Sequence, residues 1–385
     1  MTVELSRRRL LQGAAALGLL SQTLQIGAQP QANNLRVFVD GLSFLPDDLN
    51  DLSASKLDAY LCDISEIEAI KQPDGTTNYK RTFKACIKSI SEASARVISN
   101  PNHLILGRSG TDISLANERN KTAVFFQIQG ADCVEESIGN NLNQLDLFHD
   151  KGLRVLQLTH HYGNKFCGGA LDNDGSQGLD IGLSHAGKDL IERLNHKNML
   201  IDVSHSSVKG ALEVAKRTSA PIVQSHGAVR EIVNHARCSP DNVIKAIADT
   251  GGLFGVFMMT FWLTNERVPT TAHYINHLKH VANVGGIDAV AIANDYPLRG
   301  HEKLLALGND NSKGVEQYVA WWHSLRARGV LGFEAEPLHV VVPELNHIER
   351  MERIDNALAN SGFSSSERDK IMGKNWQRVL NQVLV

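Results

Sequence analysis

The stretch "MLIDVSHSSVKGALEVAKRTSAPIVQSHG" (residues 199–227) contains two short apolar runs, and each run ends at a Ser-His pair. The runs are "MLIDVS" from Met199 and "PIVQS" from Pro221, with an amphipathic stretch between them. Such alternation is typical of parallel strands that are buried on both faces and covered by helices. The stretch therefore predicts a strand–helix–strand unit in which a histidine follows each strand.

Six further apolar runs extend this unit along the chain. They are "RVFVD" from Arg36, "LDAYLC" from Leu57, "TAVFFQIQG" from Thr122, "RVLQLT" from Arg154, "GLFGVF" from Gly252 and "DAVAIAND" from Asp288. Eight runs in alternation with amphipathic segments predict an α/β fold, a (β/α)8 TIM-like barrel. Such a barrel takes about 250 residues, so the 385 residues of this chain leave room for helical insertions in a single domain.

Three segments outside the barrel repeat have their own expected structure. Residues 64–120 form an insertion that we expect to be helical, with a polar turn at residues 72–79. Residues 300–340 form a second insertion, or excursion, from the barrel repeat. The tail from Ser364 has the spacing of a capped amphipathic helix, which we expect to close the barrel.

Two serines mark expected helix starts, because a serine hydroxyl can accept a hydrogen bond from a first-turn amide. Ser184 precedes "HAGKDLIERLNH", whose Leu190, Ile191 and Leu194 share one face. Ser239 precedes Pro240, which we expect as the first helical residue.

The N-terminus has the composition of an export signal. "SRRRLLQ" (Ser6–Gln12) is followed by the uncharged run "GAAALGLL" and a polar segment that ends at Asn34. The run is shorter than the about 20 apolar residues that span a bilayer. The pattern predicts a twin-arginine signal peptide and linker over residues 1–32 and a barrel domain over residues 33–385. We therefore expect the twin-arginine export machinery as a partner and a periplasmic location; the alternative is a basic tail before an alanine-rich helix.

Composition excludes some classes of function. The formal net charge is −3 and no basic block occurs, so we expect no nucleic-acid partner. The five cysteines include no C-x-x-C pair, so they give no zinc-ribbon or redox motif. In a periplasmic protein one or two disulfides could form, and buried free cysteines are the alternative.

Polar side chains follow four of the predicted strands: His160 and His161, His205, His226, and Asp295. In a (β/α)8 barrel the strand ends converge on the mouth, where active sites lie. Two imidazoles at the ends of neighbouring strands can share a zinc ion, and a carboxylate there can be a ligand or a general base for metal-bound water. The alternatives are hydrogen-bonded structural histidines and, for Asp295, a loop cap.

Several long segments, in order along nearly the whole chain, resemble the membrane (renal-type) dipeptidase family, peptidase family M19. Members of this family are binuclear zinc peptidases built on an amidohydrolase-like barrel. The similar segments are "VDG" (39–41), "GLRVLQLTH" (152–160), "GLSHAGKDLIERLNHKNMLIDVSHSS" (182–207), "APIVQSHGAVREIVNHARCSPDNV" (220–243), "GGIDAVAIANDY" (285–296) and "IMGKNWQRV" (371–379).

The resemblance implies roles for individual residues. His205 and His226 would hold the family's second metal, and Asp295 would handle protons beside the metals. His160 would polarise the scissile carbonyl of the substrate. Arg237 would bind the terminal carboxylate of a small peptide-like ligand, because a guanidinium fork fits a planar anion. The alternative is that Arg237 is a surface arginine in a loop. The resemblance also implies a homodimer.

Three positions depart from the family pattern. The His-x-Asp clamp of the first metal is replaced by Leu42 and Phe44, and the bridging glutamate by Gln129. Leucine and phenylalanine offer no zinc ligand atom, and a neutral glutamine cannot act as an anionic bridge between two cations. We therefore expect at most one zinc ion and no binuclear mechanism. A different loop register would let another acid supply a carboxylate: Asp40, Asp47, Asp48 or Asp132.

Three interpretations remain open at this point. The first is a barrel that binds or processes a small peptide-like ligand without binuclear zinc. The second is a mononuclear metallohydrolase that holds one zinc ion at His205 and His226, with Asp295 as a further possible ligand. The third is an ordinary binuclear metallodipeptidase that cleaves dipeptides.

Overall fold

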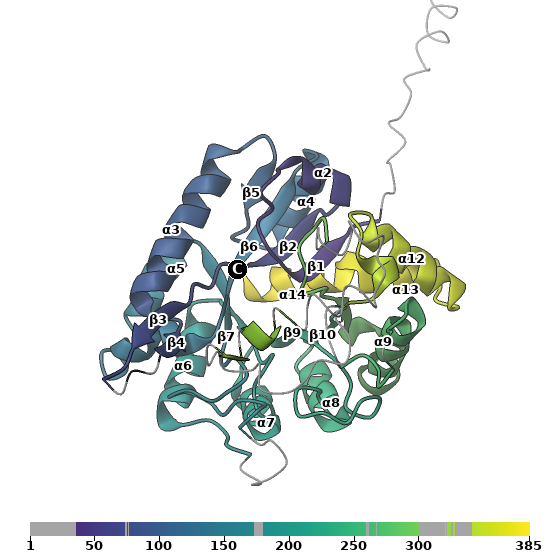
Figure 1. The fold of residues 1–385 in the computed structure, drawn as a ribbon. Helices are drawn as coiled ribbons and strands as arrows, with labels where there is room; N and C mark the ends of the chain where they lie inside the picture. The colour runs from purple at the N-terminus through teal and green to yellow at the C-terminus, as the bar shows by residue number, and fades with distance from the viewer. Residues whose placement is uncertain are drawn as a thin grey trace, which may run out of the picture. The chain divides into compact units, whose positions relative to one another are not determined.

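Eight parallel strands form the centre of the structure, a computed structural model (Figure 1). The structure describes residues 36–73, 75, 77–172, 180–258, 262–266, 268–300, 320, 322–324, 326–327 and 341–385. The eight strands, in their order around the sheet, are β1 (Val39–Ser43), β2 (Ala59–Asp63), β6 (Thr122–Gln129), β7 (Leu153–Gln157), β8 (Leu200–Asp202), β9 (Val223–Gly227), β10 (Leu253–Val256) and β11 (Val290–Ile292). Each predicted run overlaps one of them, which confirms the TIM-like barrel.

The first and last strands of this order come together at their carboxyl ends. The Asp295 amide donates a hydrogen bond to the Leu42 carbonyl oxygen (3.0 Å). Asp40 in β1 accepts from the Asn294 amide (2.8 Å) and from the Asn294 side-chain nitrogen (2.7 Å). These bonds link β1 to the residues that follow β11, so the barrel is nearly closed.

Helices lie around the outside of the strands (Figure 1). The α-helices are α2 (Asn50–Ser55), α3 (Phe83–Ser99), α4 (Thr111–Glu118), α5 (Gln144–Asp150), α6 (His185–His196), α7 (Val208–Arg217), α8 (Asp241–Asp249), α9 (Thr271–Gly285), α12 (Arg350–Asn360), α13 (Ser365–Asp369) and α14 (Asn375–Val383). Short 3-10 turns are η1 (Ala131–Ser137), η2 (Ile287–Ala289) and η3 (Pro343–Leu345), and η4 (Lys370–Lys374) is a π-helical turn. None of the described helices has both the length and the hydrophobicity needed to span a membrane.

The C-terminal helix closes the barrel at the end where the strands begin. One buried apolar cluster joins the opening residues of the strands, such as Val39, Ala59 and Val223, to Trp376 and Val379 of α14. The Trp376 indole nitrogen donates to the Ile292 carbonyl oxygen (3.0 Å). The predicted closing tail is confirmed, with a capping box between Ser364 and Glu367 at its start.

Of the two helix starts predicted from serines, one is correct and one is displaced. Ser184 caps α6 as predicted, because its hydroxyl accepts from the Gly187 amide (3.0 Å). The prediction for Ser239 was wrong by one residue: α8 begins at Asp241, and Pro240 occupies the cap position. The Ser239 hydroxyl donates to the Gln224 side-chain oxygen (2.6 Å), and no side chain caps α8.

The insertion after β2 is only partly helical, which corrects the prediction. Besides α3 and α4 it contains an antiparallel hairpin of β3 (Glu68–Lys71) and β4 (Thr77–Lys80), and β5 (Leu104–Leu106), which pairs with β6. Residues 77–79, expected in a turn, belong to β4. The predicted leader (residues 1–32) and most of the excursion at 300–340 lie outside the described residues. All five cysteines are buried and free.

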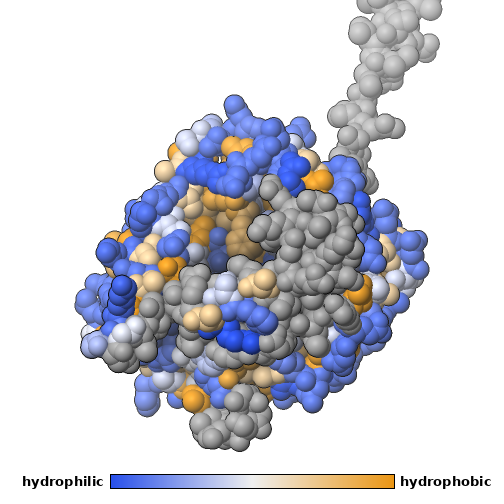
Figure 2. All heavy atoms as spheres, viewed as in Figure 1, coloured by the Kyte–Doolittle hydropathy of each residue, from blue (hydrophilic) through white to orange (hydrophobic). Residues whose placement is uncertain are grey.

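The surface viewed in Figure 2 is mostly hydrophilic. It has a hollow near its middle in which hydrophobic residues are exposed. Large exposed hydrophobic side chains elsewhere, such as Ile98 and Leu147, are scattered singly, which is normal for a folded protein.

Candidate active site at the barrel mouth

Four histidines that follow β7, β8 and β9 meet at the mouth of the barrel. The Nε2 atoms of His205 and His226 are 2.9 Å apart, and the Nδ1 atoms of His205 and His161 are 3.2 Å apart. The His160 ring is stacked on the His205 ring, with centroids 4.3 Å apart and an interplanar angle of 18°. The predicted convergence of His160, His205 and His226 is confirmed, and His161 joins them.

The backbone at three site residues adopts the left-handed conformation that side chains other than glycine rarely take. The φ angles are 59° at His161, 63° at His205 and 54° at Asp295. Such positions cost of the order of 1 kcal/mol or more each and gather at functional sites. In this barrel the left-handed residues lie in the loops after β7, β8 and β11, three or four residues beyond the strand ends.

A chain of hydrogen bonds from residues of β8 and β9 holds the His226 ring in place. The Ser225 hydroxyl donates to Oδ2 of Asp202 (2.5 Å), so its lone pair accepts from Nδ1 of His226 (2.9 Å). This leaves the Nε2 lone pair of His226 directed at His205. Asp202 is fully buried and accepts three more hydrogen bonds, from the Ser204 amide (2.8 Å), the Ser225 amide (2.9 Å) and the Gln127 side chain (2.7 Å).

The four imidazoles are neutral at pH 7. Burial lowers the pKa of His160, His205 and His226 well below the usual range, and the nearby arginine charges add to the effect. The pKa of His161 falls to about 3 for the same reasons. Neutral imidazole is the form that binds metal ions, so the cluster is ready to act as a ligand set.

Arg237 is a buried cation beside this cluster. Its guanidinium packs against the rings of Phe257 and Trp262, at 5.5 and 5.8 Å from their centroids. One nitrogen donates to the His226 carbonyl oxygen (3.3 Å), and the buried Nε has no hydrogen-bond partner. Burial lowers the pKa of Arg237 to about 10, so it stays charged at pH 7. The alternative of a surface loop position is wrong, because only 3% of the residue is exposed.

Asp295 lies across the mouth, where β11 meets β1. The side chain is half-buried, and the burial of the carboxyl group raises its pKa to about 8, although the Arg237 charge opposes the shift. At pH 7 the carboxyl group is mostly protonated. A carboxylic acid with this pKa can exchange a proton near neutral pH, as a general acid or base must.

The three positions expected to depart from the family pattern carry neither a carboxylate nor an imidazole. The Leu42 side chain is fully buried and Phe44 is half-buried. The Gln129 amide nitrogen donates to Asp63 (2.9 Å), so a neutral amide stands at the end of β6. Both oxygens of Asp40 accept hydrogen bonds from Asn294.

The positions of His205 and His226 fit a zinc ion held between them. Two ligands of a tetrahedral zinc ion at 2.0–2.1 Å lie about 3.3 Å apart, close to the 2.9 Å between the Nε2 atoms of His205 and His226. The His161 amide donates to Nδ1 of His205 (3.3 Å), so the His205 ring proton lies on Nε2 and is directed at His226. Binding of one ion through both Nε2 atoms would require this proton to leave Nε2 and the bond from the His161 amide to be given up. Within the described residues, His160, His161 and His205 form a group whose nitrogens lie within 4.8 Å of one another.

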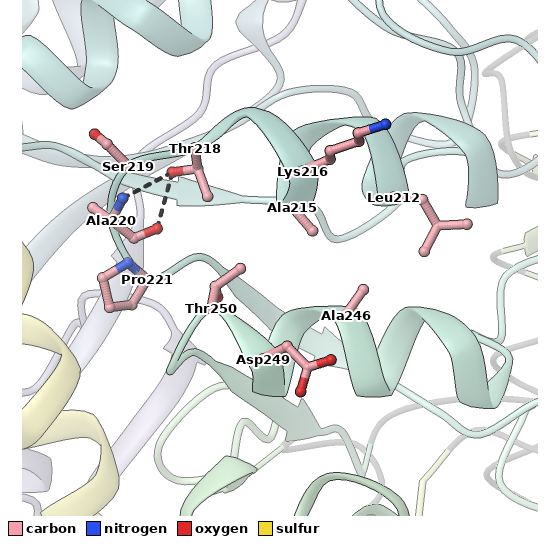
Figure 3. Close-up of a pocket in the computed structure, with 10 residues that line it drawn as sticks. All are labelled: Leu212, Ala215, Lys216, Thr218, Ser219, Ala220, Pro221, Ala246, Asp249 and Thr250. Atoms are coloured by element: carbon pink, nitrogen blue, oxygen red, sulfur yellow. Dashed lines mark hydrogen bonds between the residues drawn. The ribbon is translucent and has the colours of Figure 1, made fainter.

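A second cleft lies away from this mouth (Figure 3). It lies between α7 and α8, has a volume of about 440 Å³ and includes Thr218 and Pro221 in its wall. These residues precede β9, so the cleft is at the opposite end of the barrel from the histidines. Its charged groups, Lys216 and Asp249, form no convergent cluster. The candidate active site is therefore the part of the barrel mouth that holds His160, His161, His205 and His226, called the histidine mouth below.

Comparison with known proteins identifies the family of this chain. Residues 45–319 match the family model of the membrane dipeptidases, peptidase family M19. The chain belongs to the membrane dipeptidase family. It is 27% identical over 261 residues to the dipeptidase tcpJ of Claviceps purpurea (strain 20.1), a match that covers 66% of this chain and 50% of that protein. The chain therefore spans about half the length of this curated relative.

Solved structures share the fold. An amidohydrolase from Pseudomonas aeruginosa superposes with a TM-score of 0.70 at 24% identity, over 91% of this chain and 97% of that one. A metallopeptidase from Rhodobacter sphaeroides, solved with a phosphinate mimic of the dipeptide L-Ala-D-Ala, has a TM-score of 0.69 at 16% identity, over 90% and 99% of the two chains. At these identities the likeness concerns the fold alone.

Sequence patterns missed several residues that build the site. Asp202 and Ser225 lie inside the predicted strands, and no pattern singles them out as supports of His226. Phe257 follows β10 and Trp262 comes from the loop beyond it, and their contact with Arg237 depends on the path of that loop. His161 was not missed, because it is predicted together with His160 after the fourth run.

Proposed function

We propose that this protein is an exported member of the family that binds or processes a small peptide-like ligand at the histidine mouth, without a binuclear zinc centre. The observation that supports the proposal most directly is the replacement of three expected metal ligands by Leu42, Phe44 and Gln129. The side chain of Leu42 is packed in the core rather than left as an empty position. Without an anionic bridge, two cations about 3.5–4 Å apart have nothing to offset their repulsion.

The environment of Arg237 supports the proposal that the ligand is peptide-like. A buried guanidinium with an unpartnered nitrogen costs several kcal/mol unless an anion completes it. The terminal carboxylate of a small peptide supplies such an anion, and its two oxygens match the guanidinium fork. With the carboxylate there, the peptide bond would lie toward the imidazoles, where His160 can donate a hydrogen bond to its carbonyl oxygen and Asp295 can exchange a proton.

Elemental analysis tests the metal content. We expect at most one zinc ion per chain in protein purified without chelator and then dialysed against zinc. Two ions would contradict the proposal and support a binuclear dipeptidase. As a matched gain-of-ligand control, the triple variant Leu42→His, Phe44→Asp, Gln129→Glu restores the family's donor types and should raise the zinc content above that of the wild type.

A mononuclear hydrolase is the second candidate, and the facing Nε2 atoms of His205 and His226 favour it. A zinc ion bound there would supply an activated water or polarise a carbonyl. If one ion is found, the double variant His205→Ala, His226→Ala should lose it, whereas His196→Ala, in the last turn of α6, should keep it. An ion that survives the double substitution would place the metal elsewhere.

Export is proposed from the N-terminal sequence alone. Arg7 and Arg8 form the expected twin-arginine pair, which the export machinery recognises as an address rather than as charge. In a bacterial host with the pathway, the full chain should appear in the periplasmic fraction. The variant Arg7→Lys, Arg8→Lys keeps the charge and should remain in the cytoplasm; equal export of both proteins would contradict the proposal.

A further inference from the structure

Arg81 lies beside the barrel mouth although it belongs to the insertion after β2. It follows the hairpin strand β4 and precedes α3. Its side chain packs at the end of β6, because a Cβ atom built on Gly130 would lie 3.3 Å from Arg81 Cδ and 3.8 Å from Nε. Gly130 directly follows Gln129, one of the three altered ligand positions. The insertion therefore brings a cation to the rim of the site.

The guanidinium of Arg81 is not neutralised by any described residue. Its Nε is buried and has no hydrogen-bond partner, and no described carboxylate lies within 4.0 Å of it. Asp132 also approaches Gly130 but forms no ion pair with Arg81. A guanidinium without an ion-pair partner among the described residues can take a carboxylate of a ligand as that partner.

Arg81 and Arg237 bring two positive charges to the mouth, and both act on the histidines. Burial lowers the pKa of His160, and the Arg81 charge is the next largest cause; both arginines act in the same way on His161. The imidazoles are therefore neutral and add no positive charge of their own. At the end of β6 the chain has the neutral Gln129, and the two described carboxylates near it, Asp63 and Asp132, form no ion pair with Arg81.

The two arginines flank the histidines on opposite sides. Arg81 packs at the end of β6 and Arg237 lies beyond β9, and the histidine-bearing ends of β7 and β8 separate them in the barrel order. A ligand that places its terminal carboxylate on Arg237 must cross the imidazoles to reach Arg81. The group that Arg81 contacts therefore belongs to the far end of the ligand.

We propose that Arg81 binds a second carboxylate, carried by the residue of the ligand that is remote from its terminal carboxylate. The preferred ligands are then acidic dipeptides such as Glu-Ala or Asp-Ala. This inference rests on the proposed function, since it takes Arg237 as the site of the terminal carboxylate. Arg81 acts here as a specificity-determining binding residue.

Paired dipeptides test the inference. Dissociation constants of Glu-Ala and Gln-Ala, which are nearly isosteric and differ in charge, are measured by calorimetry on the protein as purified. Where a dipeptide is cleaved, kcat/KM replaces the dissociation constant. Wild-type protein should favour Glu-Ala by about 10- to 100-fold, the range expected for hydrogen bonds to a charged group. The variant Arg81→Gln should lose this preference and retain the affinity for Gln-Ala.

Lys84→Gln is the matched control, because it removes one positive charge from the first turn of α3 at an exposed position and should leave the preference unchanged. Arg81→Gln should unfold at the wild-type temperature, since Arg81 has no partner to lose. Equal affinities of wild type for both dipeptides, or a preference that survives in Arg81→Gln, would overturn the inference and leave the proposed function intact. If no dipeptide binds at all, the proposed function fails and the inference falls with it.

Discussion

Trp376→Ala is expected to lower the free energy of unfolding by about 3–5 kcal/mol, the range for deleting a buried aromatic side chain. Trp376 is fully buried in α14, in the apolar cluster that fills the barrel where the strands begin. It lies so close to β1 that a Cβ on Gly41 would be 2.4 Å from the indole ring. The substitution removes this packing and also leaves the buried Ile292 carbonyl oxygen without its donor.

Urea denaturation followed by circular dichroism measures this effect. Trp376→Phe keeps most of the ring volume and loses only the indole N–H, so its loss should be clearly smaller. Gln377→Ala changes the neighbouring, partly exposed residue of the same helix and should shift stability by less than about 0.5 kcal/mol. A loss below about 1 kcal/mol for Trp376→Ala would contradict the view that α14 closes the barrel.

The barrel could be predicted because its strands are short, apolar and buried on both faces. Runs such as "MLIDVS" and "DAVAIAND" differ plainly from the amphipathic segments between them. The hairpin of β3 and β4 has no such contrast. The Glu68–Lys71 strand alternates half-buried and exposed residues, mixes charged with apolar side chains, and is only four residues long, so the pattern did not separate it from a loop or a helix.

The site could be predicted only where a side chain follows a strand. His205 and His226 satisfy that rule, and their Nε2 atoms do meet. Arg81 does not, because it reaches the mouth from an insertion whose path depends on packing between α3 and η1 rather than on the barrel repeat. Asp202 lies inside an apolar strand, where a sequence pattern gives no sign that its carboxylate collects four hydrogen bonds.

Asp202→Ala is expected to affect both stability and the histidine site. Four donors would lose their acceptor: the amides of Ser204 and Ser225, the Ser225 hydroxyl and the Gln127 side chain. Each unsatisfied buried donor costs about 1–3 kcal/mol, so the total loss should be roughly 4 kcal/mol or more. Asp202→Asn keeps the volume and one oxygen acceptor, and its loss should be intermediate.

The same substitution should loosen His226, because the Ser225 hydroxyl that accepts from its Nδ1 is held by Asp202. Groups that orient a metal-binding histidine typically contribute 10- to 100-fold to metal affinity. If the wild type binds zinc, competition with a chromogenic chelator should show that loss for the folded Asp202→Asn variant. Asp249→Ala, at an exposed ion pair with Lys245, is the control and should change neither quantity. Wild-type stability in Asp202→Ala would mean that the strands beneath His226 are held by packing alone, and that the buried carboxylate has no part in positioning the imidazole.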